Sequence, residues 1–311
     1  MRKQDVILLT CTFSGMLMGL LMPFLAEPLS WFPRTSMTVM LFISFLSVDG
    51  REAWQSLISY PLAVFLLVIL KLIVLPVACW WIFHLILPEY AFGAALIGGA
   101  ATAVAAPFFA FMVQADFILV MVGLVTTSLL LPFTMPMMLA FLGSMAGTQG
   151  GIQVDLPVTA MMLNLSTLLL IPFVGAQILR RIRPVLTEKI LLRRQALFLV
   201  SYSLTNVVIF GQYAAIITNS PRYVLMAFVC ATLTSLVVFT IAAATTFWLP
   251  PVKQLAFVIS CVSVNNIVVL IIAVDFFSSP EALTTAMYSV PLFVAVLLYR
   301  LLSKLRGYDP K

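Results

Sequence analysis

The sequence consists largely of long apolar runs separated by short polar or proline-containing segments. An α-helix needs about 20 apolar residues to cross the hydrocarbon core of a bilayer, and several of the runs reach that length. Only 9% of the residues are charged and 63% are hydrophobic, which leaves too little charge for a water-exposed surface. The chain is therefore expected to be an all-α polytopic membrane protein. The same composition excludes intrinsic disorder.

The apolar runs predict ten transmembrane helices. Their approximate boundaries are 6–24, 35–48, 59–87, 91–113, 117–144, 157–180, 195–217, 221–248, 252–275 and 283–303. With both termini inside, 14 Lys and Arg residues fall on the inside and only Arg34 and Arg222 fall outside. Basic residues concentrate on the cytoplasmic side of membrane proteins. We therefore predict a multi-pass protein of the cell inner (plasma) membrane with both termini in the cytoplasm.

The ten predicted helices divide into two groups of five at the Gly- and Gln-rich loop 147–155. An odd number of helices in each group gives the two groups opposite orientations, which is the inverted-repeat layout of many secondary transporters. We predict a first five-helix repeat over residues 1–150 and a second, inverted repeat over residues 151–311.

The fourth predicted helix of each repeat contains a stretch that favours an interruption. Residues 98–107 are Gly- and Ala-rich and end in Pro107, and residues 260–266 end in two adjacent amides. Interrupted helices near the midplane form the binding sites of such transporters. The alternatives are ordinary small-residue packing and hydrogen bonding between helices. The predicted substrate-binding residues are Lys71, Thr102, Pro107, Ser263, Asn265 and Asn266.

Lys71 is a charged residue within the third predicted helix, with apolar residues on both sides. A lysine at this depth costs on the order of 3 kcal/mol, so it usually faces a cavity or a partner; the alternative is snorkelling to the interface. Lys71 could carry a proton or act as a fixed counter-charge for an anion. The candidate ion-coupling residues are Lys71, Cys261, Thr126, Thr127 and Ser128. The three hydroxyl groups could instead bond back to their own helix, and Cys261 could be a small buried residue.

Several classes of function are excluded by what the sequence lacks. A single histidine, His84, and four cysteines without CxxC spacing argue against a metal site or a disulfide framework. The basic residues lie between apolar runs, which indicates membrane orientation and not nucleic-acid binding. The chain has no HExxH or GxSxG motif, and an enzyme is not expected. Asp116 is predicted to cap the fifth helix.

A further set of stretches is informative when taken in order: residues 19–23, 42–50, 72–76, 115–116 with 129–132 and Pro136, and 168–175 followed by Arg180 and Arg181. In these stretches the chain resembles the bile acid:sodium symporter family, within the wider group that includes arsenite and auxin-efflux-like carriers. The resemblance implies a core domain of about 59–144 plus 221–303 and a panel domain of about 6–48 plus 157–217. It also implies that helices 4 and 9 are broken and cross each other.

The resemblance also implies sodium ligands, and this chain departs from them. The family's ninth helix typically reads Glu-Thr-Gly-x-Gln-Asn, where this chain has residues 261–266 with Cys261 in the place of the carboxylate. A Ser-Asn pair expected in the fourth helix falls on Ala106 and Pro107, and a glutamine expected in the third falls on Lys71. We hypothesise that Lys71 occupies the volume where relatives bind sodium.

Together these features predict a secondary active transporter of a small organic anion that works by alternating access in the lipid bilayer. We expect it to be sodium-independent or proton-coupled, with no cofactor. The alternatives are a sodium-coupled organic anion symporter, a metalloid-oxyanion carrier with Cys261 as a soft ligand, and a non-transporting membrane sensor on the same scaffold. Substrate identity and oligomeric state do not follow from the sequence.

Overall fold

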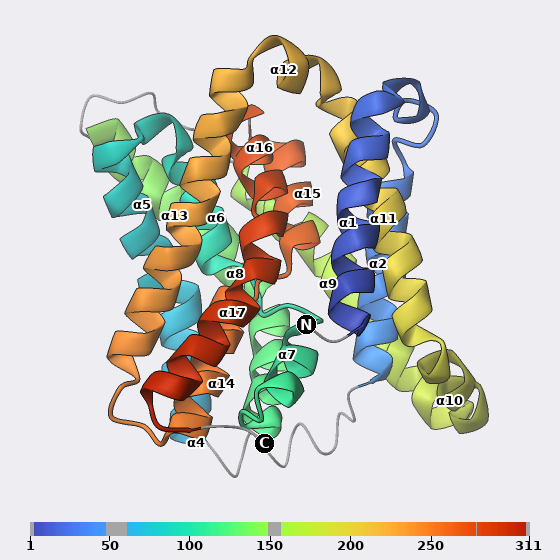
Figure 1. Cartoon of the computed structure of the whole chain (residues 1–311), viewed down its shortest axis with the longest axis vertical. Coiled ribbons are helices and arrows are strands. Elements are labelled where there is room, and N and C mark those ends of the chain that lie inside the picture. The colour runs from blue at the N-terminus through green and yellow to red at the C-terminus, as the bar shows by residue number, and fades with distance from the viewer. Residues whose placement is uncertain (1–2, 48–60, 149–156, 278, 309–311) are drawn as a thin grey trace. The chain divides into compact units, whose positions relative to one another are not determined.

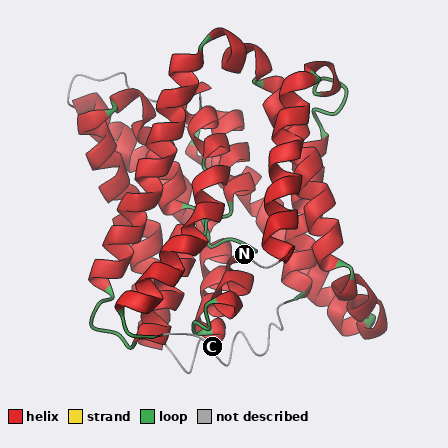
Figure 2. Cartoon of the chain, in the orientation of Figure 1, coloured by secondary structure: helices red, strands yellow, loops and turns green. Residues whose placement is uncertain are grey.

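The computed structural model describes residues 3–47, 61–148, 157–277 and 279–308. Every regular element in these ranges is a helix (Figure 2), and Thr102 and Val264 form an isolated antiparallel bridge. The predicted all-α class is confirmed. Residues 149–155 of the predicted Gly- and Gln-rich loop lie outside the described ranges.

Long apolar helices identify an integral, multi-pass membrane protein. Among the described residues, four helical stretches are long and apolar enough to cross a membrane, and a fifth is added if one bent pair of helices counts as a single span. The four are Pro61–Ile86, Phe117–Ala146, Val158–Ile182 and Pro221–Thr245, and the bent pair is Ser279–Leu292 with Val294–Leu305. Shorter apolar helices accompany them. The number of ten spans, the inverted repeat and the orientation stay predictions.

The helices group into two compact units, which are Met1–Asp49 with Leu168–Leu225 and Gly50–Thr167 with Met226–Lys311. The first unit contains α1 (Lys3–Leu21), η1 (Pro23–Leu25), α2 (Phe32–Leu46), the second half of α9 (Val158–Ile182), α10 (Pro184–Leu192), α11 (Arg194–Gln212) and α12 (Ala214–Asn219). Helix α13 (Pro221–Thr245) begins in this unit and continues in the second. The predicted core and panel domains stay predictions.

Small residues allow α1 and α11 of the first unit to pack closely, side by side (Figure 1). Gly15 and Gly19 lie one helical turn apart on α1 and face the backbone carbonyls of Ser203 and Val207. A side chain at either glycine would hold the helices apart, so the missing Cβ atoms make the contact possible.

The second unit holds the remaining helices: α4 (Pro61–Ile69), η2 (Leu70–Val74), α5 (Leu75–Ile86), η3 (Pro88–Tyr90), α6 (Ala91–Gly99), α7 (Ala106–Met112), α8 (Phe117–Thr148), α14 (Pro251–Val262), α15 (Asn266–Phe276), α16 (Ser279–Met287) and α17 (Ser289–Leu305). Four predicted spans, 91–113, 195–217, 252–275 and 283–303, therefore each consist of two helices. Helices α4, η2 and α5 form one continuous stretch, in which η2 is a π-helical turn. Pro76 follows this turn and has no N–H to donate, so the regular bonding pattern cannot continue through it.

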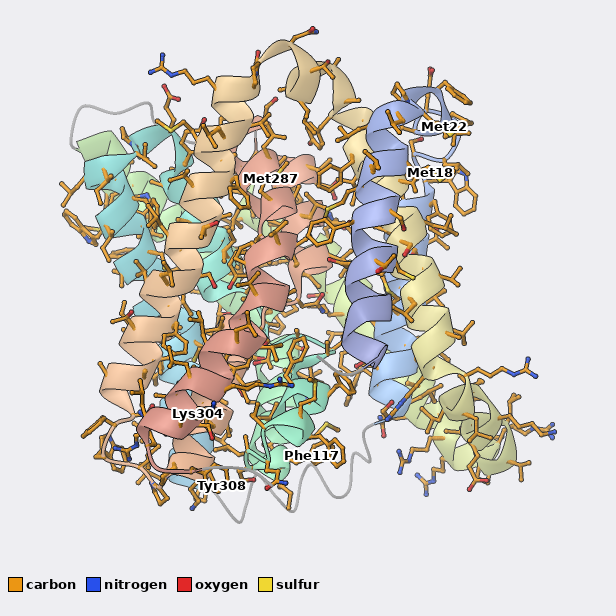
Figure 3. The ribbon with its side chains drawn as sticks, viewed as in Figure 1. Met18, Met22, Phe117, Met287, Lys304 and Tyr308 are labelled. Carbon is orange, nitrogen blue, oxygen red and sulfur yellow. The ribbon has the colours of Figure 1, made fainter. Side chains whose placement is uncertain are left out.

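At one end of the second unit, the segments that connect the helices form hydrogen bonds. Asp116 Oδ1 accepts a hydrogen bond from the Leu119 N–H at 3.0 Å, which confirms the predicted helix cap. Tyr308 donates from its hydroxyl group to Gln114 O at 2.9 Å. Figure 3 shows Tyr308, Lys304 and Phe117 at this same end.

Candidate functional site

Two interrupted helices of the second unit meet at their breaks. Helix α6 is separated from α7 by residues 100–105, and α14 from α15 by residues 263–265; we call these two breaks the crossover. The Ala103 N–H donates to Ser263 O at 2.6 Å, and the Asn265 N–H donates to Ala101 O at 2.8 Å. The helices are thus interrupted within the stretches where the sequence predicted it, and the breaks are joined to each other. Substrate binding at this place stays a prediction.

Local sequence explains the break between α6 and α7. Pro107 lies in the first turn of α7, where its missing N–H and fixed φ suit the start of a helix. Ala100 takes an extended conformation after α6 ends. A Cβ atom built on Gly98 or Gly99 would lie 3.0 Å from atoms of Leu75, Cys79 or Pro76, so these two glycines serve the close packing of α6 on α5. Pro107 is buried.

Four carbonyl groups at the C-terminal end of α14 are each bonded by a different residue. The donor–acceptor pairs are Thr102 Oγ1 to Ser260 O (3.0 Å), Lys71 Nζ to Cys261 O, Tyr288 Oη to Val262 O (2.8 Å) and the Ala103 N–H to Ser263 O (2.6 Å). The last carbonyls of a helix have no partner within the helix, and a buried end needs partners from elsewhere. The broken end of α14 is therefore satisfied by protein groups alone.

Lys71 is the charged member of this set. Its side chain is 0% exposed, so the snorkelling alternative is wrong. Its ammonium group donates to Cys261 O, and within the described residues it has no carboxylate partner. A helix C-terminus carries a partial negative charge that favours a cation. The structure thus places the charge of Lys71 at the C-terminal end of α14.

Of the three hydroxyl groups in residues 126–128 of α8, one is hydrogen-bonded and two have no partner among the described residues. Thr127 Oγ1 donates to Gly123 O at 2.7 Å, as the back-bonding alternative expected, and also accepts from the Thr102 N–H at 3.1 Å. Thr127 therefore ties α8 to the crossover. The buried hydroxyl oxygens of Thr126 and Ser128 have no hydrogen-bond partner among the described residues.

Two asparagines mark the N-terminal end of α15. Asn265 is 8% exposed and Asn266 is 5% exposed. Asn266 Nδ2 donates to Ser289 Oγ at 2.9 Å, whereas Asn265 Nδ2 and Asn266 Oδ1 have no partner in the described part of the chain. A buried polar atom without a partner costs about 1–3 kcal/mol. A donor and an acceptor are thus left at a helix N-terminus, where the partial charge is positive.

Sequence reasoning missed two tyrosines that the structure brings to this site. Tyr288 binds Val262 O, and the Tyr299 and Ser263 hydroxyl groups lie 2.8 Å apart. Both tyrosines are fully buried. Their position in the last apolar run was the available signal, because a tyrosine hydroxyl in an apolar environment usually needs a hydrogen-bond partner.

Replacing Thr127 by valine is expected to destabilise the protein by about 1–3 kcal/mol. The buried Thr102 N–H would lose its acceptor, and valine has the shape of threonine without the oxygen. Thr134→Val is the matched control, since Thr134 lies on the same helix and bonds only back to Leu130 O. Thermal melting in detergent measures the difference. An equal effect of both substitutions would contradict the role of Thr127 as a tie to the crossover.

The fold and the site together define a class of protein. Long apolar helices, with two interrupted helices that meet inside one compact unit, occur in many secondary transporters. The sequence profile of the Sodium Bile acid symporter family matches residues 34–220, more than half of the chain, and the chain belongs to this family. Members of this family are transporters and not enzymes. A comparison with curated proteins gave no match.

Proposed function

We propose that the protein moves a small organic anion across the membrane by alternating access and that it does so without sodium coupling. The observation that carries the proposal is the buried ammonium group of Lys71, bonded to Cys261 O at the C-terminal end of α14. A covalently attached cation supplies at this helix end the positive charge that a bound monovalent cation would supply. Sodium is then unnecessary there, and a proton carried by Lys71 is the coupling ion that remains.

The α15 end of the crossover is the proposed place of the anion. The helix N-terminus attracts negative charge, the Asn265 amide N–H groups can donate to the anion, and Asn266 Oδ1 can accept from a hydroxyl or N–H group on it. The hydroxyl groups of Thr102 and Ser263 already have protein partners. We therefore place direct substrate contact at Asn265 and Asn266. Contacts by Lys71, Thr102, Pro107 and Ser263 remain predictions.

A sodium-coupled organic anion symporter is the second candidate. Thr126 and Ser128 each present a buried hydroxyl oxygen without a partner among the described residues, and oxygen atoms are the ligands that hard cations prefer. The backbone oxygen of Cys261 already accepts from Lys71, so it is not open to sodium. The buried Cys261 thiol as a soft ligand for a metalloid oxyanion stays a prediction. The two candidates differ in one measurable property, the effect of sodium.

Ligand binding can be tested before transport. The purified protein is melted with acetate, pyruvate, succinate and methanesulfonate, each in choline buffer and in sodium buffer. We expect at least one of these anions to raise the melting temperature in choline, with no further rise in sodium. Stabilisation that appears only in sodium would favour the symporter.

Transport is then measured with the stabilising anion in proteoliposomes. We expect wild-type uptake to change less than about twofold with a sodium gradient and to rise with a pH gradient, and Lys71→Gln to lose the uptake that the pH gradient drives. Uptake driven by sodium in both the wild type and Lys71→Gln contradicts the proposal. Binding without uptake would favour the sensor alternative.

A further inference from the structure

A basic segment surrounds α10 of the first unit. Six of the residues from 180 to 194 are Arg or Lys and one, Glu188, is acidic. The basic residues are Arg180, Arg181, Arg183, Lys189, Arg193 and Arg194. We call residues 180–194 the α10 surface. It begins at the C-terminal end of α9 and, in Figure 1, lies at the N-terminal end of α11.

Two of these basic residues bond to the neighbouring helix α2, and the others do not. Arg180 donates to Leu46 O at 3.0 Å, and Arg194 lies 3.5 Å from Ser47 Oγ. The side chains of Arg181, Arg183, Lys189 and Arg193 are exposed and form no hydrogen bond or ion pair with any described residue. The positive charge of these four side chains is therefore exposed and not neutralised by the described part of the protein.

Large apolar side chains are exposed on the same segment. The exposed fractions are 66% for Ile182, 65% for Val185, 47% for Leu186 and 86% for Leu192. Helix α9 is a candidate membrane span that ends at Ile182, and α10 begins two residues later. The segment therefore begins where a span leaves the hydrocarbon, at the level of the lipid headgroups. At this level, exposed apolar side chains can enter the interface while neighbouring Lys and Arg side chains reach the headgroups.

We propose that the α10 surface binds anionic phospholipids in the leaflet where α9 ends. The charges are complementary, because the exposed groups are cationic and the phosphate groups of these lipids are anionic. Leu192 and Val185 enter the acyl-chain region while the basic side chains reach the phosphates. A second copy of this chain would bring the same positive charge to the contact and be repelled. The inference does not depend on the identity of the transported anion.

The strength of the interaction follows from the number of charges. Each Lys or Arg near an anionic bilayer strengthens binding about fivefold, and salt screens this effect. Removing two exposed charges is therefore expected to weaken binding of an anionic lipid by at least about tenfold and to leave binding of a zwitterionic lipid unchanged.

The test compares three double variants with the wild-type protein. Native mass spectrometry measures the binding of phosphatidylglycerol and of phosphatidylcholine to the purified full chain at fixed ionic strength. Arg181→Gln with Arg193→Gln removes two charges from the surface, and Arg181→Lys with Arg193→Lys keeps them. Arg34→Gln with Arg222→Gln removes two charges elsewhere on the first unit. Melting in detergent checks that each variant is folded.

We expect the wild type to prefer phosphatidylglycerol and the glutamine variant to lose the preference by at least about tenfold. The lysine variant should stay within about twofold of the wild type, and the Arg34/Arg222 variant should be unchanged. Equal preference in the wild type and the glutamine variant overturns the proposal, as does a loss in the lysine variant. Dimer formation that the glutamine variant abolishes, without any lipid preference, would assign the surface to a second copy and also overturn it.

Discussion

Replacing Lys71 by methionine is expected to reduce transport of the anion by at least about 100-fold while the protein stays folded. Methionine has a similar length but no charge and no donor, so Cys261 O loses its partner, at a cost of about 1–3 kcal/mol. Removing a buried charge also removes its desolvation penalty, which offsets that cost. The melting temperature is therefore expected to change by only about 3 °C, since the two effects oppose each other. Uptake in proteoliposomes and melting in detergent measure the two quantities on one preparation.

Lys304→Met is the matched control for this experiment. Lys304 lies in the last turn of α17 and is exposed (Figure 3), so its replacement should change neither transport nor melting. Wild-type transport by Lys71→Met would contradict the functional role of the buried charge. A variant that fails to fold would instead make Lys71 a structural cap of α14.

A single methyl group added at Gly19 is expected to separate α1 from α11. A Cβ atom there would lie 2.4 Å from Val207 O and 3.0 Å from the Gly211 N atom. Both neighbours belong to the backbone and cannot rotate away as a side chain could, so the helices must shift. Overpacking of this kind typically costs about 1–3 kcal/mol, and we expect Gly19→Ala to lower the melting temperature by roughly 4–10 °C.

Gly175→Ala is the control for Gly19→Ala. Gly175 lies inside α9 of the same unit, and a Cβ atom there would lie 3.5 Å from Phe42 Cε2, an ordinary contact. Alanine is the better helix former by roughly 0.5–1 kcal/mol, so the melting temperature should stay the same or rise slightly. If both substitutions lower it equally, the close contact of α1 and α11 does not limit stability.

The candidate site was predictable where one residue constrains the local backbone or the local charge. Pro107 cannot continue a helix through its own position, and a helix does break just before it. Lys71 in an apolar run requires a buried partner, and it has one in Cys261 O. Asp116 could be identified as a cap because a helix begins at the next residue. Each of these conclusions depends on the local backbone or the local apolar surroundings, which neighbouring residues in the chain define.

The partners of these groups were not predictable, because they come from distant parts of the chain. Lys71 and Cys261 are 190 residues apart, and Thr102 and Ser260 are 158 apart. The position of the two tyrosines in an apolar run indicates that each hydroxyl group needs a partner, but not that the partners are Val262 and Ser263. Likewise, Gly19 lies in an apolar run like many other glycines, and only the approach of Val207 O shows why a side chain is excluded there.

The sequence by itself determined that this is a membrane protein, because a chain with so little charge and such long apolar runs cannot form a water-exposed surface. It also determined where two helices are interrupted and which charge is out of place. Only the tertiary structure decided which polar groups are already bonded and which remain available. In an apolar interior each group must find its partner within the protein. Asn265 Nδ2 and Asn266 Oδ1 therefore stand out only after the partners of Lys71, Thr102, Ser263 and Tyr288 are known.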